Sequence, residues 1–378
     1  MAAHVAWVCH SYPAGQPEWL PCRCIPTRAG DAWPQATTPP CRQTQKQAQK
    51  QARSQAQNRP QNRSQSQAQN MEEGEQLMFV ITGASGRTGR AAAVRLLAQG
   101  HPVRAVGRAA RRLDDLAERG AEVWEADQAD TAALTDAFRG AAGVYAVIQP
   151  NYIPDHPDFG AFQDRVATSL AEAVAASGVT RVVGLSSWGA QHAAGTGPVA
   201  GLHRFEQRLS TVPGVDALWL RAGYFMENLL EHVDSVRELH RISAPFDPDL
   251  PLPFVSTRDI GDRAADELAN GRWRGREILE LQGEREVSMR EATDLIAKAV
   301  GVDDLAYEQV SIDRFHAELR RMGVSANVAD MMAEVGTSLN LRHTRMQQPR
   351  STRTSTPTSL ERFVAEEFAP RYRATGTK

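Results

Sequence analysis

From residue 78 onward, short apolar runs alternate with stretches whose apolar residues recur at helical spacing. The short runs predict parallel strands, and the longer stretches predict the helices that connect them. This alternation is typical of an α/β fold, here a doubly wound parallel Rossmann sheet with right-handed crossovers. Strands are expected at 78–82, 103–107, 122–125, 144–148, 181–186, 217–221 and 277–281.

Further along the chain the pattern changes to mixed helix and loop. Asp259 is expected to cap one helix, and Ser288 with Glu291 matches a capping box that begins another. We therefore divide the folded part into an NAD(P)-binding Rossmann domain at 71–228 and a smaller, helix-rich C-terminal substrate lobe at 229–378, which contributes the late strand to the sheet. Helices of the lobe are expected at 260–269, 292–300, 313–322, 328–339 and 360–368.

The first 70 residues show no apolar periodicity and are rich in Gln and Pro. They contain eight Lys and Arg residues against two acidic ones. Such a segment cannot bury enough apolar surface to offset the entropy lost on ordering, so a disordered basic tail is expected at 1–70. Two interpretations stay open: an organelle-targeting peptide, or an extension upstream of a true start at Met71 or Met78. The lack of an amphipathic Arg/Ser pattern favours the second.

The tail holds all four cysteines, at positions 9, 22, 24 and 41. The remainder therefore has no thiol nucleophile, disulfide or cysteine metal site, and we predict no metal. No apolar run approaches the roughly 18 residues of a membrane span, so we expect no membrane contact and a cytoplasmic protein. Without the tail the net charge is −8. That acidity makes nucleic acid an improbable partner.

The segment 79–89, Phe-Val-Ile-Thr-Gly-Ala-Ser-Gly-Arg-Thr-Gly, runs from an apolar strand through a glycine turn into a helix expected at 90–99. In such a turn, backbone N–H groups and the positive end of the helix dipole meet a pyrophosphate. The Gly-x-x-Gly-x-x-Gly spacing suits the short-chain dehydrogenase/reductase branch. The sequence therefore predicts that a dinucleotide is bound by Gly83, Ala84, Ser85, Gly86, Arg87, Thr88 and Gly89.

The residues after the second strand discriminate between NAD and NADP. Enzymes that prefer NAD usually carry Asp or Glu there, whereas this chain has Arg108 and Arg112 and no acid before Asp114. Guanidinium groups suit a ribose 2′-phosphate by charge and by bidentate geometry, and Arg87 can add to the same site. The alternative is that these arginines only solvate the start of a helix. The pattern favours NADP(H).

Asp127 and Gln128 follow the third predicted strand. A carboxylate and an amide at the carboxyl end of a strand can reach an adenine edge. Equally, Asp127 could only cap a helix that begins near Thr131. Both interpretations stay open.

With these features in view, the chain resembles the NmrA-like group of atypical short-chain dehydrogenases/reductases over about residues 78–372. That group includes NADPH-sensing proteins, quinone reductases and isoflavone-reductase-like enzymes. The stretch 220–228, Leu-Arg-Ala-Gly-Tyr-Phe-Met-Glu-Asn, closely matches a signature that lines the nicotinamide and substrate pocket of the family. The stretch 356–363 is typical of its bacterial members.

The resemblance implies an NADP(H)-binding Rossmann fold, with the glycine turn on the phosphates. It also implies that Arg108 and Arg112 bind the 2′-phosphate, and that Asp127 and Gln128 contact the adenine. A loop after strand four, which begins at Gln149, is expected near the nicotinamide. Together with the 220–228 signature it implies further cofactor contacts from Pro150, Asn151, Tyr152, Tyr224, Phe225 and Asn228.

The chain departs from ordinary short-chain dehydrogenases, which place Tyr and Lys four residues apart so that the phenol can donate a proton. No such pair is present, and the Lys of many atypical relatives is replaced near Leu202 or His203. His203, Ser186 and Tyr224 are the remaining catalytic candidates. Each has a structural alternative: an ordinary helix histidine, a serine that ends a strand, and a ring packed against nicotinamide.

Two functions stay open. The first is an NADPH-dependent reductase of a small molecule, a quinone or conjugated carbonyl, by hydride transfer; a quinone accepts hydride readily, so a missing proton donor is tolerable. The second is a non-catalytic NADP(H) redox sensor acting through a protein partner, which the missing Lys favours. We favour the reductase. A DNA-binding regulator is disfavoured by the acidic body.

Overall fold

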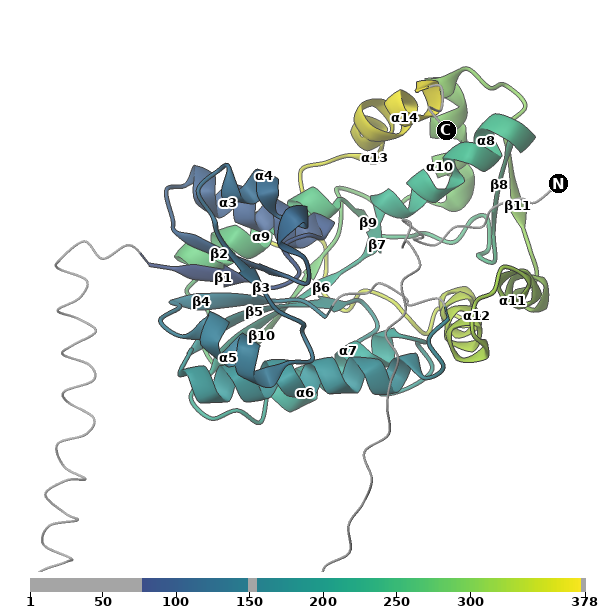
Figure 1. The fold of residues 1–378 in the computed structure, drawn as a ribbon. Coiled ribbons are helices and arrows are strands. Elements are labelled where there is room, and N and C mark those ends of the chain that lie inside the picture. The colour runs from purple at the N-terminus through teal and green to yellow at the C-terminus, as the bar shows by residue number, and fades with distance from the viewer. Residues whose placement is uncertain (1–76, 149–154, 375–378) are drawn as a thin grey trace, which may run out of the picture. The chain divides into compact units, whose positions relative to one another are not determined.

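The structure is a computed structural model that describes residues 77–148 and 155–374. Its central sheet has seven parallel strands in the order β10-β6-β5-β4-β1-β2-β3 (Figure 1). The order reverses between β1 and β4, as it does in a Rossmann sheet, so the predicted fold class is confirmed. The strands are β1 (Phe79–Ile81), β2 (Val103–Gly107), β3 (Glu122–Glu125), β4 (Gly143–Ala146), β5 (Arg181–Ser187), β6 (Asp216–Ala222) and β10 (Arg276–Leu281).

Helices cover both faces of this sheet (Figure 1). Phe79 and Ile81 point into a core beneath the helices of one face, while Val80 between them belongs to the core of the other face. This alternation follows from the two-residue period of a strand, and burial on both sides explains why β1 is apolar throughout. One face carries α3 (Arg87–Ala98), α4 (Asp114–Ala117) and α9 (Thr257–Asn270); the other carries α5 (Thr131–Phe138), α6 (Phe159–Ser177) and α7 (Val199–Leu209).

The lobe beyond β6 has an apolar core of its own, and a smaller cluster holds its two outer helices against Phe159. The larger core is enclosed by η2 (Met226–His232), α8 (Val233–Leu239), α10 (Met289–Val300), α13 (Leu360–Phe363), the π-helical η3 (Val364–Phe368) and α14 (Ala369–Arg373). The outer helices are α11 (Ile312–Arg321) and α12 (Ala326–Asn340).

Two short parallel strand pairs in the lobe were not predicted. They are β7 (Tyr224–Phe225) with β9 (Phe254–Val255), and β8 (Arg241–Ala244) with β11 (Ala306–Gln309). The strands β7 and β9 are too short for a recognisable two-residue alternation, and β8 and β11 lie in the region of mixed helix and loop.

Two expected helix caps have different outcomes. At α10 the Ser288 half of the expected capping box is present, because the N–H of Glu291 donates to Ser288 Oγ at 3.2 Å, whereas the Glu291 carboxylate pairs with Arg285 at 2.7 Å. The expected cap at Asp259 is wrong, because Ser256 caps α9. Asp259 lies in the first turn of that helix and accepts hydrogen bonds from the backbone N–H and the hydroxyl of Thr358. It thereby ties the C-terminal segment to α9.

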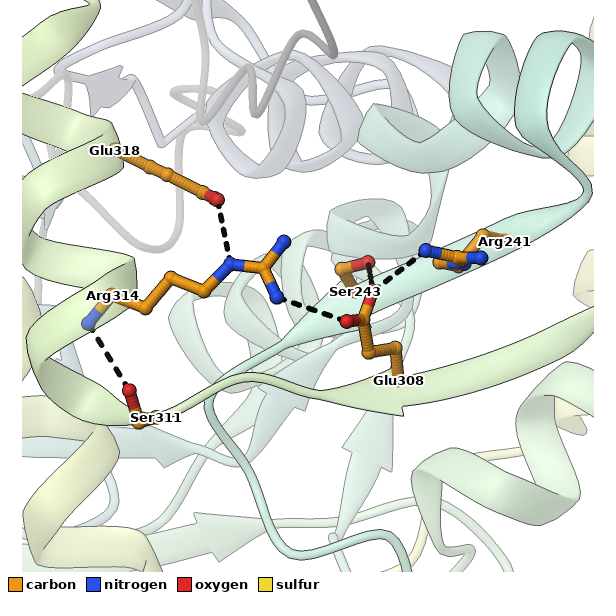
Figure 2. A network of polar contacts seen from close by, with 6 residues as sticks. All are labelled: Arg241, Ser243, Glu308, Ser311, Arg314 and Glu318. Atoms are coloured by element: carbon orange, nitrogen blue, oxygen red, sulfur yellow. Dashed lines mark hydrogen bonds and ion pairs between the residues drawn. The ribbon is translucent and has the colours of Figure 1, made fainter.

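An exposed ionic network joins α11 to the β8–β11 pair (Figure 2). Arg314 donates to Glu308 and to Glu318, both at 3.0 Å, and Arg241 donates to the other oxygen of Glu308 at 3.1 Å. Burial would raise the pKa of Glu308, but the two guanidinium groups outweigh it and lower that pKa. Pairs of this kind on the surface contribute little to stability.

The outer edge of β10 is covered by residues 341–356, which we call the C-terminal strap. Gln348 pairs with the edge through its side chain, accepting from the N–H of Glu280 and donating to the carbonyl of Ile278. The buried Glu280 carboxylate in turn accepts from the N–H groups of Gln347 and Gln348 at 2.6 and 2.7 Å. An edge protected in this way cannot add a foreign strand, and the strap is held at a fixed position on the sheet.

Candidate functional site

The glycine turn at the end of β1 has a backbone that favours glycine at position 83 and requires it at position 89. Gly83 has φ of +62°, in the left-handed region. At Gly89 a Cβ would lie 2.4 Å from the carbonyl oxygen of Gly83, closer than two atoms can approach. The N–H of Gly86 closes the turn by donating to the same carbonyl at 2.8 Å. The turn therefore presents bare backbone, as a phosphate site requires.

Helix α3 begins directly at this turn without a side-chain cap. Its N-cap is Gly86, and its first turn contains no acidic residue. The N–H groups of the first turn and the positive end of the helix dipole therefore favour an anion at this point. Arg87 is exposed beside it.

The arginines after β2 lie where the sequence places them. Arg108 and Arg112 are exposed, and within the described part of the chain neither side chain forms an ion pair. The nearby Asp115 is instead bonded to Arg90. The two guanidinium groups are thus available to an anion, although their role toward NADP stays a prediction.

Asp127 and Gln128, the two polar residues after β3, do not cap the following helix. Asp130, not Asp127, caps α5, so the capping interpretation of Asp127 is wrong; Asp127 accepts from the N–H of Ala129 at 2.8 Å. Gln128 is buried and donates to the carbonyl of Val147 at 2.7 Å, which links the ends of β3 and β4. Their contact with adenine stays a prediction.

Glu227 links the family-like stretch 220–228 to the glycine turn. Its carboxylate accepts from the N–H of Thr257 at 3.0 Å and from the Thr257 hydroxyl, at the first residue of α9. Burial raises the pKa of Glu227, while the hydrogen bonds from Thr257 and the charge of Arg87 oppose that rise. Glu227 is therefore an acidic neighbour of both Arg87, the first residue of α3, and Thr257, the first residue of α9.

A pocket of about 220 Å³ lies at the carboxyl ends of β4, β5 and β6. The other walls come from α6, α7, α12 and the C-terminal strap. Its aromatic walls are Phe159, Trp188, Tyr224 and Phe225. Its aliphatic walls include Ile148, Leu185, Val199, Leu202, Val335 and Leu339. Its polar side chains are Gln163, Ser186, Ser187, Thr196, Asn228 and Thr344.

A buried ion pair supports the pocket at the end of β5. Arg221 donates to Glu206 from Nε at 2.9 Å and from Nη2 at 2.6 Å, and both side chains are under a tenth exposed. Ser186 donates to the same carboxylate at 2.5 Å. Such a bidentate pair is rigid, and loss of one partner would leave the other charge buried.

The three catalytic candidates are not equivalent in the structure. Tyr224 and Ser186 line the pocket, but the Ser186 proton is engaged with Glu206. His203 is half-buried outside the lining, with Nδ1 at 2.8 Å from the carbonyl oxygen of Ala190. Phe225 and Asn228 also belong to the lining. The remaining cofactor candidates, Pro150, Asn151 and Tyr152, lie outside the described residues.

Sequence reasoning missed the pocket residues of α6 and α12 and the Glu206–Arg221 pair. A signal for the pair existed, because Arg221 interrupts an apolar strand and a buried arginine requires an acidic partner. The position of Trp188, one residue after the end of β5, was a signal for the pocket itself, because a large aromatic side chain at the carboxyl end of a central strand can line a ligand site. Thr344 carried none, since it lies in a polar stretch with no periodicity.

In residues 77–148 and 155–374, no helix combines the length and the apolar character needed to cross a membrane. Over the same residues, no group of three or more His, Cys, Asp or Glu side chains converges in a way that could hold a metal ion.

The fold and this site define a Rossmann-type α/β protein with a glycine turn on one side of the switch point and a pocket on the other. The family model described as the NmrA-like family matches residues 75–364. The chain therefore belongs to the NmrA-like family, and the resemblance inferred from the sequence is confirmed.

Two curated relatives are reductases by name. The chain is 30% identical over 236 residues to a (4-alkanoyl-5-oxo-2,5-dihydrofuran-3-yl)methyl phosphate reductase of Streptomyces griseus, covering 62% of this chain and 78% of that protein. It is 26% identical over 261 residues to quinone oxidoreductase 2 of Escherichia coli, covering 68% and 86%.

Solved structures share the fold. An NADPH-dependent quinone oxidoreductase of Escherichia coli, complexed with NADPH, has a TM-score of 0.65 at 22% identity and covers 77% of this chain and 100% of that one. NmrA, a negative transcriptional regulator solved with NADP, has a TM-score of 0.63 at 16% identity and covers 79% and 98%. At such identities the likeness concerns the fold alone.

Proposed function

We propose that this chain is an NADPH-dependent reductase that transfers hydride to a quinone or another conjugated carbonyl. One observation carries the proposal. An uncapped helix N-terminus with unpaired arginines lies on one side of the strand-order switch point, and a largely apolar pocket lies on the other. In doubly wound sheets, ligands bind outside the carboxyl ends of the strands at this point.

The residues of the turn fit the diphosphate of a dinucleotide. Bare backbone at Gly83 and Gly89 gives the close approach that a diphosphate needs, and a Cβ at Gly89 would destroy it. Arg108, Arg112 and Arg87 would hold the 2′-phosphate, which favours NADP(H) over NAD(H). Among the structural neighbours, the quinone oxidoreductase of Escherichia coli was solved with NADPH, and NmrA was solved with NADP and also with NAD, which supports a nicotinamide dinucleotide in this turn.

The pocket residues suit an acceptor that needs little acid catalysis. When bound, the cofactor supplies the hydride, and this chain supplies orientation and an apolar wall that excludes water. Ser186 cannot donate to an acceptor while its proton is bonded to Glu206. Tyr224 lines the pocket and contributes its ring to the aromatic wall against which an acceptor ring can pack. A quinone that accepts hydride becomes a stabilised anion and can take its proton from water.

The experiment that tests the proposal is an assay of the purified full chain with NADPH and a series of quinones and enones, followed by the loss of NADPH absorbance. We expect turnover with at least one acceptor and a lower KM for NADPH than for NADH. A complete absence of NADPH oxidation over the series would overturn the reductase.

A redox sensor is the second candidate, and a specific observation favours it. The candidate proton donors Ser186 and His203 form hydrogen bonds within the protein, Ser186 with Glu206 and His203 with the backbone carbonyl of Ala190. A sensor must distinguish NADP from NADPH, because only a difference in affinity can shift its state toward a partner protein. Equal dissociation constants for the two nucleotides, measured by calorimetry, would exclude it.

A further inference from the structure

We propose that the pocket selects uncharged acceptors and rejects anionic ones, and that Leu202 is a position that sets this selectivity. This inference deepens the reductase proposed above and rests on it for the identity of the ligand as an acceptor. Its basis is the charge of the pocket wall, which is independent of the glycine turn.

No Lys, Arg, His, Asp or Glu is present among the pocket-lining residues of the described chain. An anion that entered this pocket would lose its hydration without gaining an opposite charge. Burial of an unpaired charge is strongly unfavourable, whereas an uncharged ring loses little.

Two arginines close to lining residues, Arg221 and Arg204, are already paired with carboxylates. Behind the wall, the Arg221 guanidinium donates two hydrogen bonds to Glu206, at 2.9 and 2.6 Å. Beside the pocket, Arg204 is paired with Asp164 at 2.7 Å. Neither guanidinium is therefore available to a carboxylate, sulfonate or phosphate on a ligand.

Several polar groups of the wall are also unavailable to an anion. Gln163 donates through Nε2 to the carbonyl of Pro198 at 3.0 Å, which leaves its oxygen, an acceptor, without a partner among the described residues. Ser186 donates to Glu206, and Thr344 shares its hydroxyl with Ser338 at 2.8 Å. Ser187, Thr196 and Asn228 remain as uncharged polar groups beside an aromatic and aliphatic surface, a wall that suits a flat, uncharged ring.

Leu202 offers a way to reverse this selectivity. It lies on α7 in the pocket wall and is only half-buried, so a longer side chain at this position can be accommodated. Leu202→Arg would place one uncompensated cation in the wall. If that variant is poorly folded, Val199→Lys does the same from the start of the helix, where Val199 is also half-buried and in the lining.

The test compares naphthoquinone with naphthoquinone sulfonate, which share a ring and differ in one negative charge. Binding to the full chain is measured by calorimetry without NADPH, because the phosphates of the cofactor would themselves repel the sulfonate. We expect the uncharged quinone to bind at least about tenfold more tightly than the sulfonate, and Leu202→Arg to shift that ratio about tenfold or more toward the sulfonate. Leu239→Arg, which adds the same charge at an exposed position of α8, should leave the ratio unchanged.

The outcomes separate this inference from the reductase. Equal affinities, tighter binding of the sulfonate or no binding of either compound would overturn the selectivity. An unchanged ratio in well-folded Leu202→Arg and Val199→Lys would overturn the role of the wall. Preferential binding of the uncharged quinone without NADPH oxidation would overturn the reductase and leave the selectivity in place. Turnover of both compounds at the same kcat/KM would overturn the selectivity and leave the reductase in place.

Discussion

The glycine turn and the pocket differ in how the chain builds them. The turn is one contiguous segment, 82–89, whose geometry follows from three glycines and an uncapped helix. The pocket is assembled from strand ends, three helices and the C-terminal strap, which are separated by up to about two hundred residues. The turn presents its backbone to a ligand and exposes only Gly86 and Arg87, whereas the pocket is largely apolar and supported by a buried ion pair. A site made from one segment can be recognised in a sequence, and a site made from many cannot.

The largest effect is expected on the pocket side, from breaking the buried ion pair. Glu206→Ala leaves Arg221 buried without a partner and removes the acceptor of Ser186, so the free energy of unfolding should fall by about 3–5 kcal/mol. Urea titration measures it. The matched control is Glu308→Ala in the exposed network of Figure 2, where a loss below about 1 kcal/mol is expected. Equal losses at both positions would show that burial does not set the strength of these pairs.

The second prediction concerns the glycine turn and distinguishes the close approach of its backbone to the cofactor from the stability of the helix that follows. Gly89→Val places a Cβ within 2.4 Å of the Gly83 carbonyl, so the turn must open and NADPH affinity should fall by about a hundredfold or more. Calorimetry with NADPH measures it. Gly100→Ala is the control: its φ of +82° is strained for Ala, but a Cβ there meets nothing within 4 Å. That variant should lose about 1 kcal/mol of stability and keep its affinity for NADPH.

The third prediction tests whether the arginines after β2 determine the preference for NADPH over NADH. Arg108→Glu replaces a free cation with an anion where the 2′-phosphate is expected, so the preference for NADPH over NADH should fall about tenfold to a hundredfold. The ratio of the two dissociation constants measures it. Arg119→Glu, on an exposed arginine after α4, controls for the change in net charge. An unaltered ratio in Arg108→Glu would place the 2′-phosphate elsewhere.

The contrast between the two regions also explains how far the sequence could be interpreted. The strands β2 and β3 were predicted to the residue: β2 is largely buried and apolar, whereas β3, an edge strand of sequence Glu-Val-Trp-Glu, could be recognised from its place in the alternation of strands and helices. The strands β7 and β9 were missed because each is only two residues long, and β8 and β11 because they lie in the region of mixed helix and loop, where no regular alternation of strand and helix predicts them. The cap at Ser256 was missed because Asp259, three residues later, is an equally good cap by residue type.

The candidate site divides in the same way. The turn residues and the arginines after β2 could be proposed because motif and position lie in one segment. Tyr224 could be proposed only through the family-like stretch. Phe159 and Thr344 could not, since their contribution depends on how α6 and the strap meet over the sheet.

The smallest effect concerns the lobe beside the pocket and its response to pH. Burial lowers the pKa of His232, in η2, from 6.5 to about 4. Between pH 6.5 and 4 the unfolded chain therefore binds a proton that the folded chain does not, so stability rises with pH over this range and is lost as pH falls. Because His232 is partly exposed, we expect a loss of about 1–2 kcal/mol rather than the full value of the shift. Carboxylates titrate in the same range, so the measurement is the difference between the pH–stability curves of wild type and His232→Gln. That difference should grow as pH falls from 6.5 to 4, with the variant less sensitive. Parallel curves would show that the imidazole of His232 remains hydrated in the folded chain, and that this part of the lobe excludes water less well than the apolar pocket.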